Sequence, residues 1–148
     1  MKKSSLLVLP CACASLRRAT RTLTGLYEEA LRPSGLKSSQ FTILQALSLA
    51  GELNQGRLGE ILAMDSTTLT RTLRILERQG WLTKRPGKDR REIWLKLTKT
   101  GVTQFQSALP LWQSAQTRTQ KLLGTSRWKD LTGWSNHLTA AITQGDTL

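Results

Sequence analysis

The chain has 148 residues, a length typical of a single globular domain with a core of its own. Its 22 Lys and Arg against 10 Asp and Glu give a net charge of +12, which favours a polyanionic partner, either nucleic acid or an anionic membrane surface. The 2 cysteines and the single histidine, His137, exclude a disulfide framework, a histidine-based metal site and most histidine-dependent nucleophilic enzymes.

Two helices are predicted in the first third of the chain. Residues 14–31 show apolar side chains at helical spacing on one face, and Pro33 disfavours continuation of that helix. A second helix follows as far as Gly51, and either Ser38 or Ser39 suits its N-cap. Because this second helix is apolar on much of its surface, we expect it to lie at the centre of the fold.

The middle of the chain is predicted to form a helix, a turn, a second helix and a β-hairpin. Asp65 or Ser66 suits the N-cap of the second of these helices, and Gly80 suits its C-terminal end. In the last strand, Ile, Leu and Leu alternate with Glu, Trp and Lys, a period of two that is typical of a strand with one buried face. The expected segments are a short helix (57–64), a longer helix (66–80), and two strands (81–85 and 92–98) joined by a basic turn (86–91).

Two long helices are predicted after the hairpin. Thr98 suits the N-cap of a helix over residues 99–123, in which Pro110 removes a hydrogen bond and is expected to cause a bend. A last helix begins near Ser126 and carries one apolar stripe. The tryptophans of these helices suit either an intrachain core or a subunit interface; they are Trp112, Trp128 and Trp134.

The positive charge is concentrated in the middle of the chain. Residues 57–99 carry 11 basic and 5 acidic side chains, a net charge of +6. On a helical wheel, residues 66–80 place arginines and hydroxyls on one face and leucines on the other. Such a face suits the major groove of B-DNA, because Arg bonds guanine bidentately, Thr offers a methyl group to thymine, and a helix N-terminus holds phosphate. The candidate DNA contacts of this helix are Ser66, Thr67, Thr68, Thr70, Arg71, Arg74 and Arg78.

The turn of the hairpin is the second candidate DNA contact. Basic side chains on a hairpin suit the minor groove, whose negative potential attracts Arg. Asp89 is expected to brace a neighbouring arginine by a charge-assisted hydrogen bond. For both the helix and the hairpin, the alternative is an ordinary solvated surface. The candidate contacts of the hairpin are Lys84, Lys88, Arg90 and Arg91.

The segment from Leu58 to Gly101 resembles the winged helix-turn-helix of the MarR family of bacterial transcriptional regulators. The resemblance rests on a Thr-rich helix that ends in the Leu-Glu-x-x-Gly pattern of residues 76–80. It also rests on Asp89-Arg90-Arg91 in the hairpin and on the Leu97-Thr98 pair that closes it. The flanking helices match as well, so the resemblance covers nearly the whole chain beyond its first ten residues.

The resemblance implies a single domain, residues 1–148, that is mainly α with a small β-hairpin wing (α+β). Residues 12–36 and 99–148 would supply the helices of a dimerisation platform, and residues 37–98 the winged helix-turn-helix lobe. The implied function is that of a sequence-specific DNA-binding regulator in the cytoplasm, without a cofactor or metal. It would act as a homodimer on a pseudo-palindromic operator, and the family favours repression.

The family commonly senses small aromatic acids or phenols in a cleft between the dimerisation platform and the DNA-binding lobe. A ligand bound there would stabilise a spacing of the two lobes that does not fit DNA. The residues that the family architecture brings near such a cleft are Arg18, Tyr27, Phe41 and Trp112.

Thiol oxidation is a second sensing route in this family. In its organic-hydroperoxide-sensing branch, a reactive cysteine lies near the start of the first helix, and Cys13 falls at the matching place. Tyr27 matches a tyrosine of that branch, whereas Ser38 stands in place of its second tyrosine. A reactive thiol needs a lowered pKa, toward which Arg17 or Arg18 would contribute. The alternative is an inert, partly buried cysteine.

Two other classes of protein, an enzyme and a membrane-surface protein, are alternatives to a regulator, and an export leader is an alternative for the first residues. An enzyme would need a nucleophile with a base, a metal cluster or a phosphate loop, and the sequence offers none of them. A protein that binds membrane surfaces would use the positive charge, but that charge is concentrated on the predicted helix and hairpin. An export leader would need a longer apolar run than LLVLP, and we expect Pro10 to lead into the first helix instead.

Overall fold

The computed structural model describes residues 10–145, and these form helices with one small antiparallel sheet. The predicted fold class, mainly α with a small β-hairpin wing, is confirmed. Within this part of the chain, no helix is both long and apolar enough to cross a membrane. The elements in chain order are α1 (Ala12–Leu31), the 3-10 helix η1 (Arg32–Ser34), α2 (Ser38–Ala50), β1 (Glu52–Asn54), α3 (Gln55–Leu62), α4 (Ser66–Arg78), β2 (Leu82–Pro86), β3 (Ile93–Leu97), α5 (Lys99–Leu123) and α6 (Thr125–Gly145).

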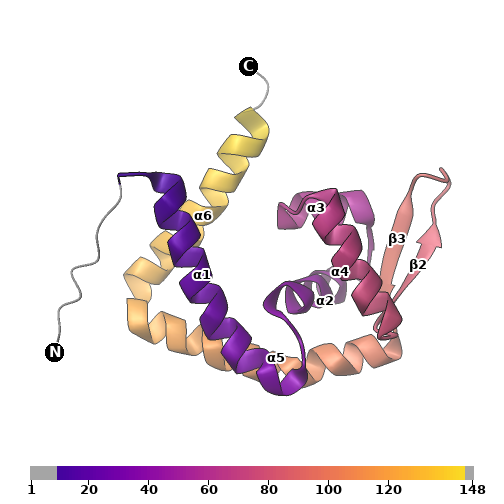
Figure 1. Ribbon diagram of the computed structural model, residues 1–148, viewed down its shortest axis with the longest axis horizontal. Helices are drawn as coiled ribbons and strands as arrows, with labels where there is room; N and C mark the ends of the chain where they lie inside the picture. Colours follow the sequence, from indigo (N-terminus) through magenta and orange to yellow (C-terminus); the bar gives the residue numbers. More distant parts are fainter. Residues whose placement is uncertain (1–9, 146–148) are drawn as a thin grey trace.

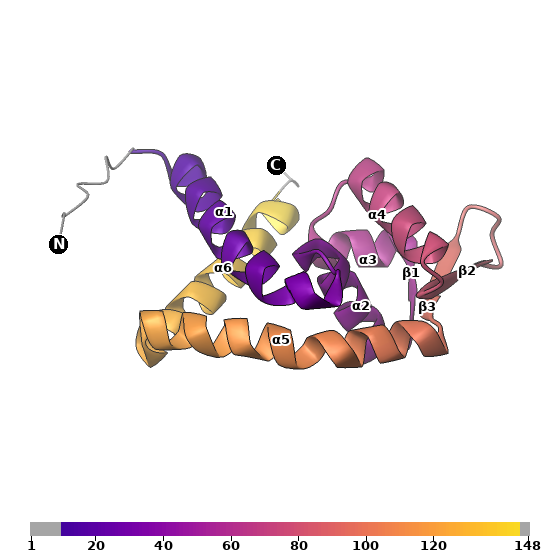
Figure 2. The same ribbon diagram turned by 60° about the horizontal axis from the view of Figure 1, so that its bottom comes forward.

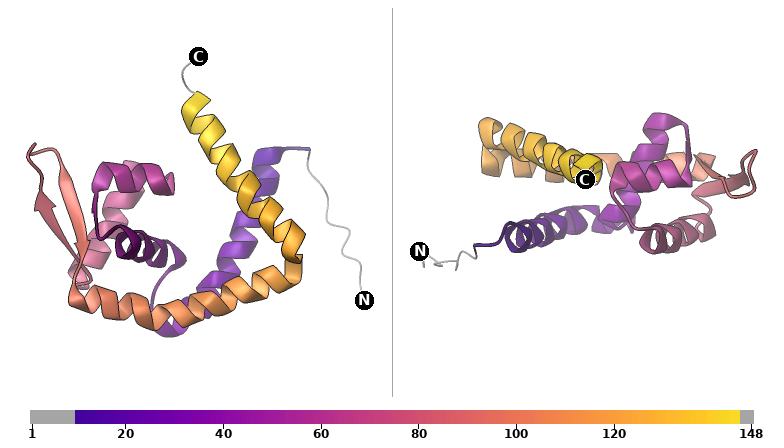
Figure 3. Two further views of the ribbon diagram at one scale, coloured as in Figure 1. Left: turned by 180° about the vertical axis from the view of Figure 1, so that it is seen from behind. Right: turned by 90° about the horizontal axis from the view of Figure 1, so that it is seen from above.

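Helix α5 runs along one side of the molecule and joins two groups of elements (Figure 1). Helices α2, α3 and α4 and the sheet gather over its N-terminal half, whereas α1 and α6 lie toward its C-terminal half (Figure 2). The hairpin and the start of α1 therefore lie at opposite ends of the molecule (Figure 3). Helix α5 continues through Pro110 as one element.

The core lies mainly between the first of these groups and α5, with Leu31 from the end of α1, and α2 is its centre, as its composition predicts. Helix α2 contributes buried apolar side chains on several of its faces. The ring of Trp112 on α5 stacks 5.6 Å from that of Phe41, so this tryptophan belongs to the intrachain core. The fully or nearly fully buried members of the core are Leu31, Leu36, Phe41, Ile43, Leu44, Leu47, Leu58, Leu69, Leu73, Leu76, Leu82, Leu95, Phe105 and Ala108.

Strand β1 is an element that the sequence pattern does not predict. It pairs antiparallel with β3, so that β3 lies between β1 and β2. A strand this short has too few residues to show an alternation of apolar and polar side chains. Helix α3 begins earlier than predicted because the side chain of Asn54 caps it, accepting hydrogen bonds from the backbone N–H groups of Gly56 and Arg57.

The prediction that Ser38 or Ser39 is the N-cap of α2 is wrong. The N-cap is Lys37, and Ser38 is the first residue of the helix. The carboxylate of Glu28 on α1 accepts hydrogen bonds from the backbone N–H of Ser38 at 2.7 Å and from its hydroxyl at 2.8 Å. A side chain from another helix therefore satisfies this helix end, which local sequence spacing does not reveal.

Candidate nucleic-acid interface

Helix α4 presents its arginines to solvent and its leucines to the core. Arg71, Arg74 and Arg78 are exposed, and in the part of the chain that the structure describes none of them forms an ion pair. Their guanidinium groups are therefore available to phosphates or base edges. The leucines of the opposite face are all buried; they are Leu69, Leu73 and Leu76.

Asp65 caps the N-terminus of α4, one of the two alternatives that the sequence leaves open. Its carboxylate accepts a 2.8 Å hydrogen bond from the backbone N–H of Thr68. Hydrogen bonds from the side chain and the backbone of Thr68 lower the pKa of Asp65. Ser66 and Thr67 are exposed at this end of the helix, whereas Thr68 is half-buried. Of the predicted contacts in the first turn, Ser66 and Thr67 thus share the exposed surface, while Thr68 takes part in the cap.

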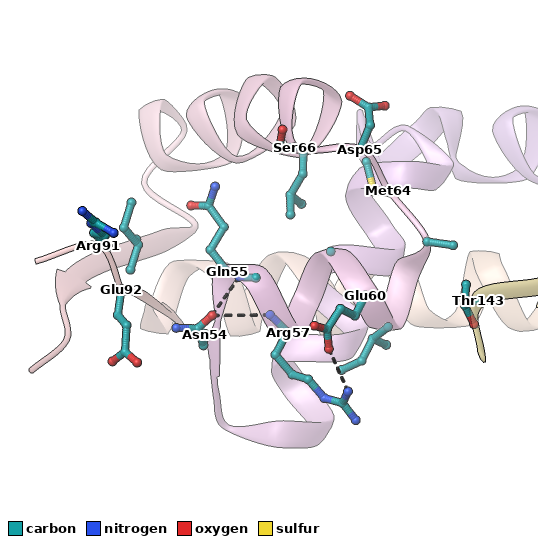
Figure 4. Close-up of a pocket in the computed structure, with 16 residues that line it drawn as sticks. Asn54, Gln55, Arg57, Glu60, Met64, Asp65, Ser66, Arg91, Glu92 and Thr143 are labelled. Atoms are coloured by element: carbon teal, nitrogen blue, oxygen red, sulfur yellow. Dashed lines mark hydrogen bonds and ion pairs between the residues drawn. The ribbon is translucent and has the colours of Figure 1, made fainter. Parts of the chain in front are cut away.

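Thr70 takes part in the packing between α3 and α4. It is half-buried, and its hydroxyl oxygen accepts a 3.2 Å hydrogen bond from the side-chain amide of Gln55. Figure 4 shows the Gln55 side chain reaching from the start of α3 toward α4. Gln55 precedes the short helix that the sequence predicts, so no sequence signal marks it as a partner of the predicted DNA contacts.

The hairpin of β2 and β3, here called the wing, carries the second group of predicted contacts. Lys88, Arg90 and Arg91 are exposed around its tip and form no ion pair among the described residues. Asp89 braces the tip, but not through a guanidinium as predicted. Its carboxylate accepts a 3.0 Å hydrogen bond from the backbone N–H of Arg91, the usual role of Asp in a turn.

Lys84 lies apart from the other predicted contacts. It is opposite Leu95 in the sheet and therefore on the face that packs against the core. Its ammonium group lies 2.8 Å from the carboxylate of Glu77 on α4, and its side chain is only 24% exposed. Lys84 thus links the wing to α4, while Lys88, Arg90 and Arg91 are exposed at the tip.

An open cleft of about 1210 Å³ borders this surface (Figure 4). It is lined by α3, the turn before α4, the end of the wing and Thr143 of α6, so it separates the winged lobe from the C-terminal helix. Inside it, Arg57 and Glu60 pair at 2.9 Å. Across residues 10–145, no group of three His, Cys, Asp or Glu side chains is arranged to hold a metal ion.

Three of the four residues predicted for an effector cleft line one cavity. Tyr27, Phe41 and Trp112 border a space of about 580 Å³ between α1, α2 and α5, and Arg18 is not among the lining residues. The Tyr27 hydroxyl donates a hydrogen bond to the side-chain carbonyl of Gln116. Burial raises the pKa of Tyr27, although a hydrogen bond with the Thr119 side chain acts in the opposite direction.

Both cysteines lie at the start of α1 and are exposed in the single chain. Cys11 is the N-cap, and its Sγ accepts a hydrogen bond from the backbone N–H of Ala14 at 3.5 Å. The Sγ of Cys13 lies 3.8 Å from Nη2 of Arg17, one turn further along the helix. Arg17 is one of the two arginines considered from the sequence, and it contacts this thiol.

Comparison with known proteins assigns this architecture to a family. Residues 36–93 match the MarR family. The uncharacterized HTH-type transcriptional regulator YwoH of Bacillus subtilis is 33% identical over 91 residues, which cover 62% of this chain and 66% of that protein. The organic hydroperoxide resistance transcriptional regulator of Bacillus subtilis is 31% identical over 100 residues, which cover 67% and 68%.

This chain thus spans just under two thirds of the first relative and just over two thirds of the second. The solved structures include a more extensive match. The complex of the M. tuberculosis transcriptional regulator MosR with DNA is 34% identical, with a TM-score of 0.82, and covers 93% of this chain and 99% of the MosR chain. The chain therefore belongs to the MarR family of transcriptional regulators.

Proposed function

We propose that this MarR-family transcriptional regulator binds a pseudo-palindromic operator as a homodimer and represses transcription there. The observation that carries the proposal is the exposed face of α4, on which Arg71, Arg74 and Arg78 form no ion pair within the described chain. Proteins of this family are DNA-binding regulators and not enzymes, and MosR was solved with DNA bound. In this proposal α4 is the recognition helix in the major groove, and the wing tip contacts the minor groove.

The homodimer is supported by apolar side chains that the single chain leaves exposed. On α6, Trp134, Leu138 and Ile142 are 72%, 39% and 60% exposed and follow one another at helical spacing. An exposed stripe of this kind marks an interaction surface, and a second copy related by a two-fold axis would cover it. We assign residues 12–36 and 99–148 to the dimerisation platform and residues 37–98 to the DNA-binding lobe; residues 146–148 lie outside the described part of the chain. A dimer of this kind presents two recognition helices to successive major grooves, roughly 34 Å apart.

The cavity beside Tyr27 supports regulation by a small aromatic or phenolic effector. It offers the aromatic rings of Phe41 and Trp112 and the hydroxyl of Tyr27, the mixture of apolar and polar groups that small-molecule sites use. An effector that fits the cavity in only one arrangement of the lobes would shift the dimer toward that arrangement.

Thiol oxidation is the alternative route to release from DNA, as in a dedicated organic-hydroperoxide sensor that acts through Cys13. It is supported by the exposure of Cys13, by its contact with Arg17, and by the name of a relative, the organic hydroperoxide resistance transcriptional regulator.

A cytoplasmic location stays a prediction from the DNA-binding function.

Selection of DNA sequences tests the central proposal. Purified full-length protein is mixed with a pool of random duplexes, bound duplexes are amplified through several rounds, and binding to the enriched sequence is compared with its scrambled version at one salt concentration. We expect a two-fold symmetric motif whose half-sites are centred roughly 10 base pairs apart, bound by two chains. If no sequence is enriched over the starting pool, sequence-specific operator binding is ruled out.

A further inference from the structure

One face of the three-stranded sheet carries a cluster of interacting side chains, one from each strand. Arg85 of β2 donates hydrogen bonds of 2.8 Å from Nε and from Nη2 to the two carboxylate oxygens of Glu52 on β1. To reach Glu52 the guanidinium crosses β3, where it lies 5.4 Å from the ring centroid of Trp94. The register brings Trp94 opposite Arg85 on one side and opposite Asn54 on the other, so the cluster lies on a single face of the sheet.

The geometry of this cluster directs the Arg85 guanidinium toward Glu52. A bidentate pair between Arg and a carboxylate is strong and directional, and stacking on an aromatic face adds to it. The remaining Nη1 donates a 3.5 Å hydrogen bond to the carbonyl oxygen of Pro86. Arg85 therefore differs from Arg90 and Arg91, which form no ion pair among the described residues.

The cluster joins the wing to the helix-turn-helix. Glu52 belongs to the strand that leads directly into α3, and Asn54 at the end of that strand caps α3. On the opposite face of β2, Lys84 pairs with Glu77 of the recognition helix. Successive residues of a strand face opposite sides, so β2 is fastened to β1 through Arg85 and to α4 through Lys84.

The tip of the wing packs onto the same tryptophan. A Cβ atom built on Gly87 would lie 2.4 Å from Oε2 of Glu92 and 3.0 Å from Nε1 of Trp94, so the backbone at Gly87 approaches these side chains closely. A change in the position of Trp94 would therefore shift Gly87 and the tip that carries Lys88 and Arg90.

We propose that Glu52, Arg85 and Trp94 form a clamp that holds the wing at the angle at which its tip and the recognition helix contact DNA together. Arg85 is then a positioning residue and not a DNA contact. The inference rests on the proposed function, and the experiment below separates failure of the clamp from failure of DNA binding.

The variant Glu52→Gln distinguishes a clamp from simple electrostatics. It raises the net charge by one, and a more positive protein is expected to bind DNA more tightly if charge alone decides. The clamp predicts the opposite, because the wing loses its fixed angle. Glu60→Gln is the matched control: it makes the same change in charge and also breaks an exposed ion pair of the same lobe, that of Arg57 and Glu60.

The dissociation constants of the wild type and variants are measured for the enriched duplex at one salt concentration, together with hydroxyl-radical footprints and thermal midpoints. We expect Glu52→Gln to bind about threefold more weakly, an effect of the size that exposed ion pairs produce. Protection of the minor groove by the wing should decrease while the centre of each half-site stays protected, and Glu60→Gln should bind no more weakly than wild type. If Glu52→Gln binds as tightly as wild type or more tightly, there is no clamp.

Two further variants test whether the effect of Glu52→Gln comes from a loss of folding and whether it acts through Arg85. If Glu52→Gln lowers the thermal midpoint, Glu52→Asp tests the clamp in its place. Glu52→Asp keeps the charge but shortens the side chain, so it should also weaken DNA binding. In an Arg85→Gln background, Glu52→Gln should no longer weaken binding, whereas the same weakening as in the wild-type background overturns the clamp. If the wild type binds no duplex, the proposed function fails; if it binds and Glu52→Asp binds equally well, only the clamp fails.

Discussion

The hydroxyl of Thr98 donates a 2.6 Å hydrogen bond to the carbonyl oxygen of Gly80 and so joins the end of α4 to the start of α5. The same residue caps α5, because its Oγ1 accepts a 2.9 Å hydrogen bond from the backbone N–H of Gly101. Its own N–H donates to the carbonyl oxygen of Trp81 at 3.1 Å. Since α5 runs from the winged lobe to α6 (Figure 2), this junction attaches α4, the proposed recognition helix, to the helix that leads to the proposed dimer interface.

Gly101→Ala is expected to destabilise the fold strongly. The added Cβ would lie 1.8 Å from the carbonyl oxygen of Trp81, a backbone atom that cannot move without breaking its bond to Thr98. Overpacking of this kind costs on the order of 3 kcal/mol in the free energy of unfolding, which denaturant titration measures. Gly25→Ala is the control, because its added Cβ has no contact within 4 Å beyond its chain neighbours and its own helix backbone, and Ala favours the helix by roughly 0.5–1 kcal/mol. Equal losses in the two variants would contradict the role of the junction.

Arg71→Ala should weaken binding to the enriched operator by about 1–3 kcal/mol and binding to scrambled DNA by less, because a guanidinium in the major groove reads bases. Arg90→Ala and Arg91→Ala should weaken binding more evenly across sequences, since contacts of the wing carry less base information. Gel shifts at one salt concentration measure both effects. The assignment of these residues is refuted if all three variants bind both duplexes as wild type does.

Trp134→Glu should convert the dimer into monomers and abolish tight operator binding. Burying an unpaired carboxylate in an apolar interface costs several kcal/mol, so dimerisation should weaken by more than about tenfold. Sedimentation equilibrium gives the association constant. Leu49→Glu provides the comparison, because Leu49 is an 84% exposed leucine on α2, outside the proposed platform. A Trp134→Glu protein that stays dimeric at the wild-type concentration would remove α6 from the interface.

Glu28→Gln should change how stability depends on acid pH. Burial opposes ionisation of Glu28, but hydrogen bonds from the backbone and side chain of Ser38 and the charge of Lys37 outweigh it and hold the pKa below its ordinary value of 4.5. The resulting stabilisation is therefore complete above pH 4.5 and is lost as the pH falls through the lowered pKa.

Urea unfolding across this acidic range measures the effect of Glu28→Gln. We expect the variant to lose about 1 kcal/mol or less near neutral pH, because the carboxylate is partly exposed, and to show a flatter dependence on pH below 4.5. Glu29→Gln, at an exposed neighbour on the same helix, should keep the wild-type dependence. Identical pH profiles for wild type and Glu28→Gln would argue against the bond to Ser38.

Cys13→Ser should prevent release of DNA by an organic hydroperoxide if oxidation of this thiol is the signal. The thiolate attacks one peroxide oxygen, the O–O bond breaks and the alcohol leaves, so the thiolate is oxidised to a sulfenic acid, which a serine hydroxyl cannot form. Gel shifts before and after treatment with cumene hydroperoxide, and again after addition of a thiol reductant, follow release and recovery. Release from Cys13→Ser as complete as from wild type would show that Cys13 is not the sensor.

The order of the helices and the basic face of α4 are predictable from the sequence because their causes are local. Apolar side chains recur at helical spacing, Asp65 and Thr98 cap the helices that they precede, and Gly80 adopts the positive φ that ends α4. The alternation along β3 likewise predicts its buried face, on which Leu95 lies. These features require only interactions between residues a few positions apart.

The pairing of charged and polar side chains was decided by the tertiary structure. Arg85 and Glu52 are 33 residues apart in the sequence, and they meet only because β1, which no pattern marks, joins the sheet. Lys84 resembles the other basic residues of the wing in sequence, yet its place on the inner face of the sheet directs it to Glu77. Charge and periodicity thus identify which surfaces can bind DNA, whereas the packing of distant segments decides which of the charges remain free to do so.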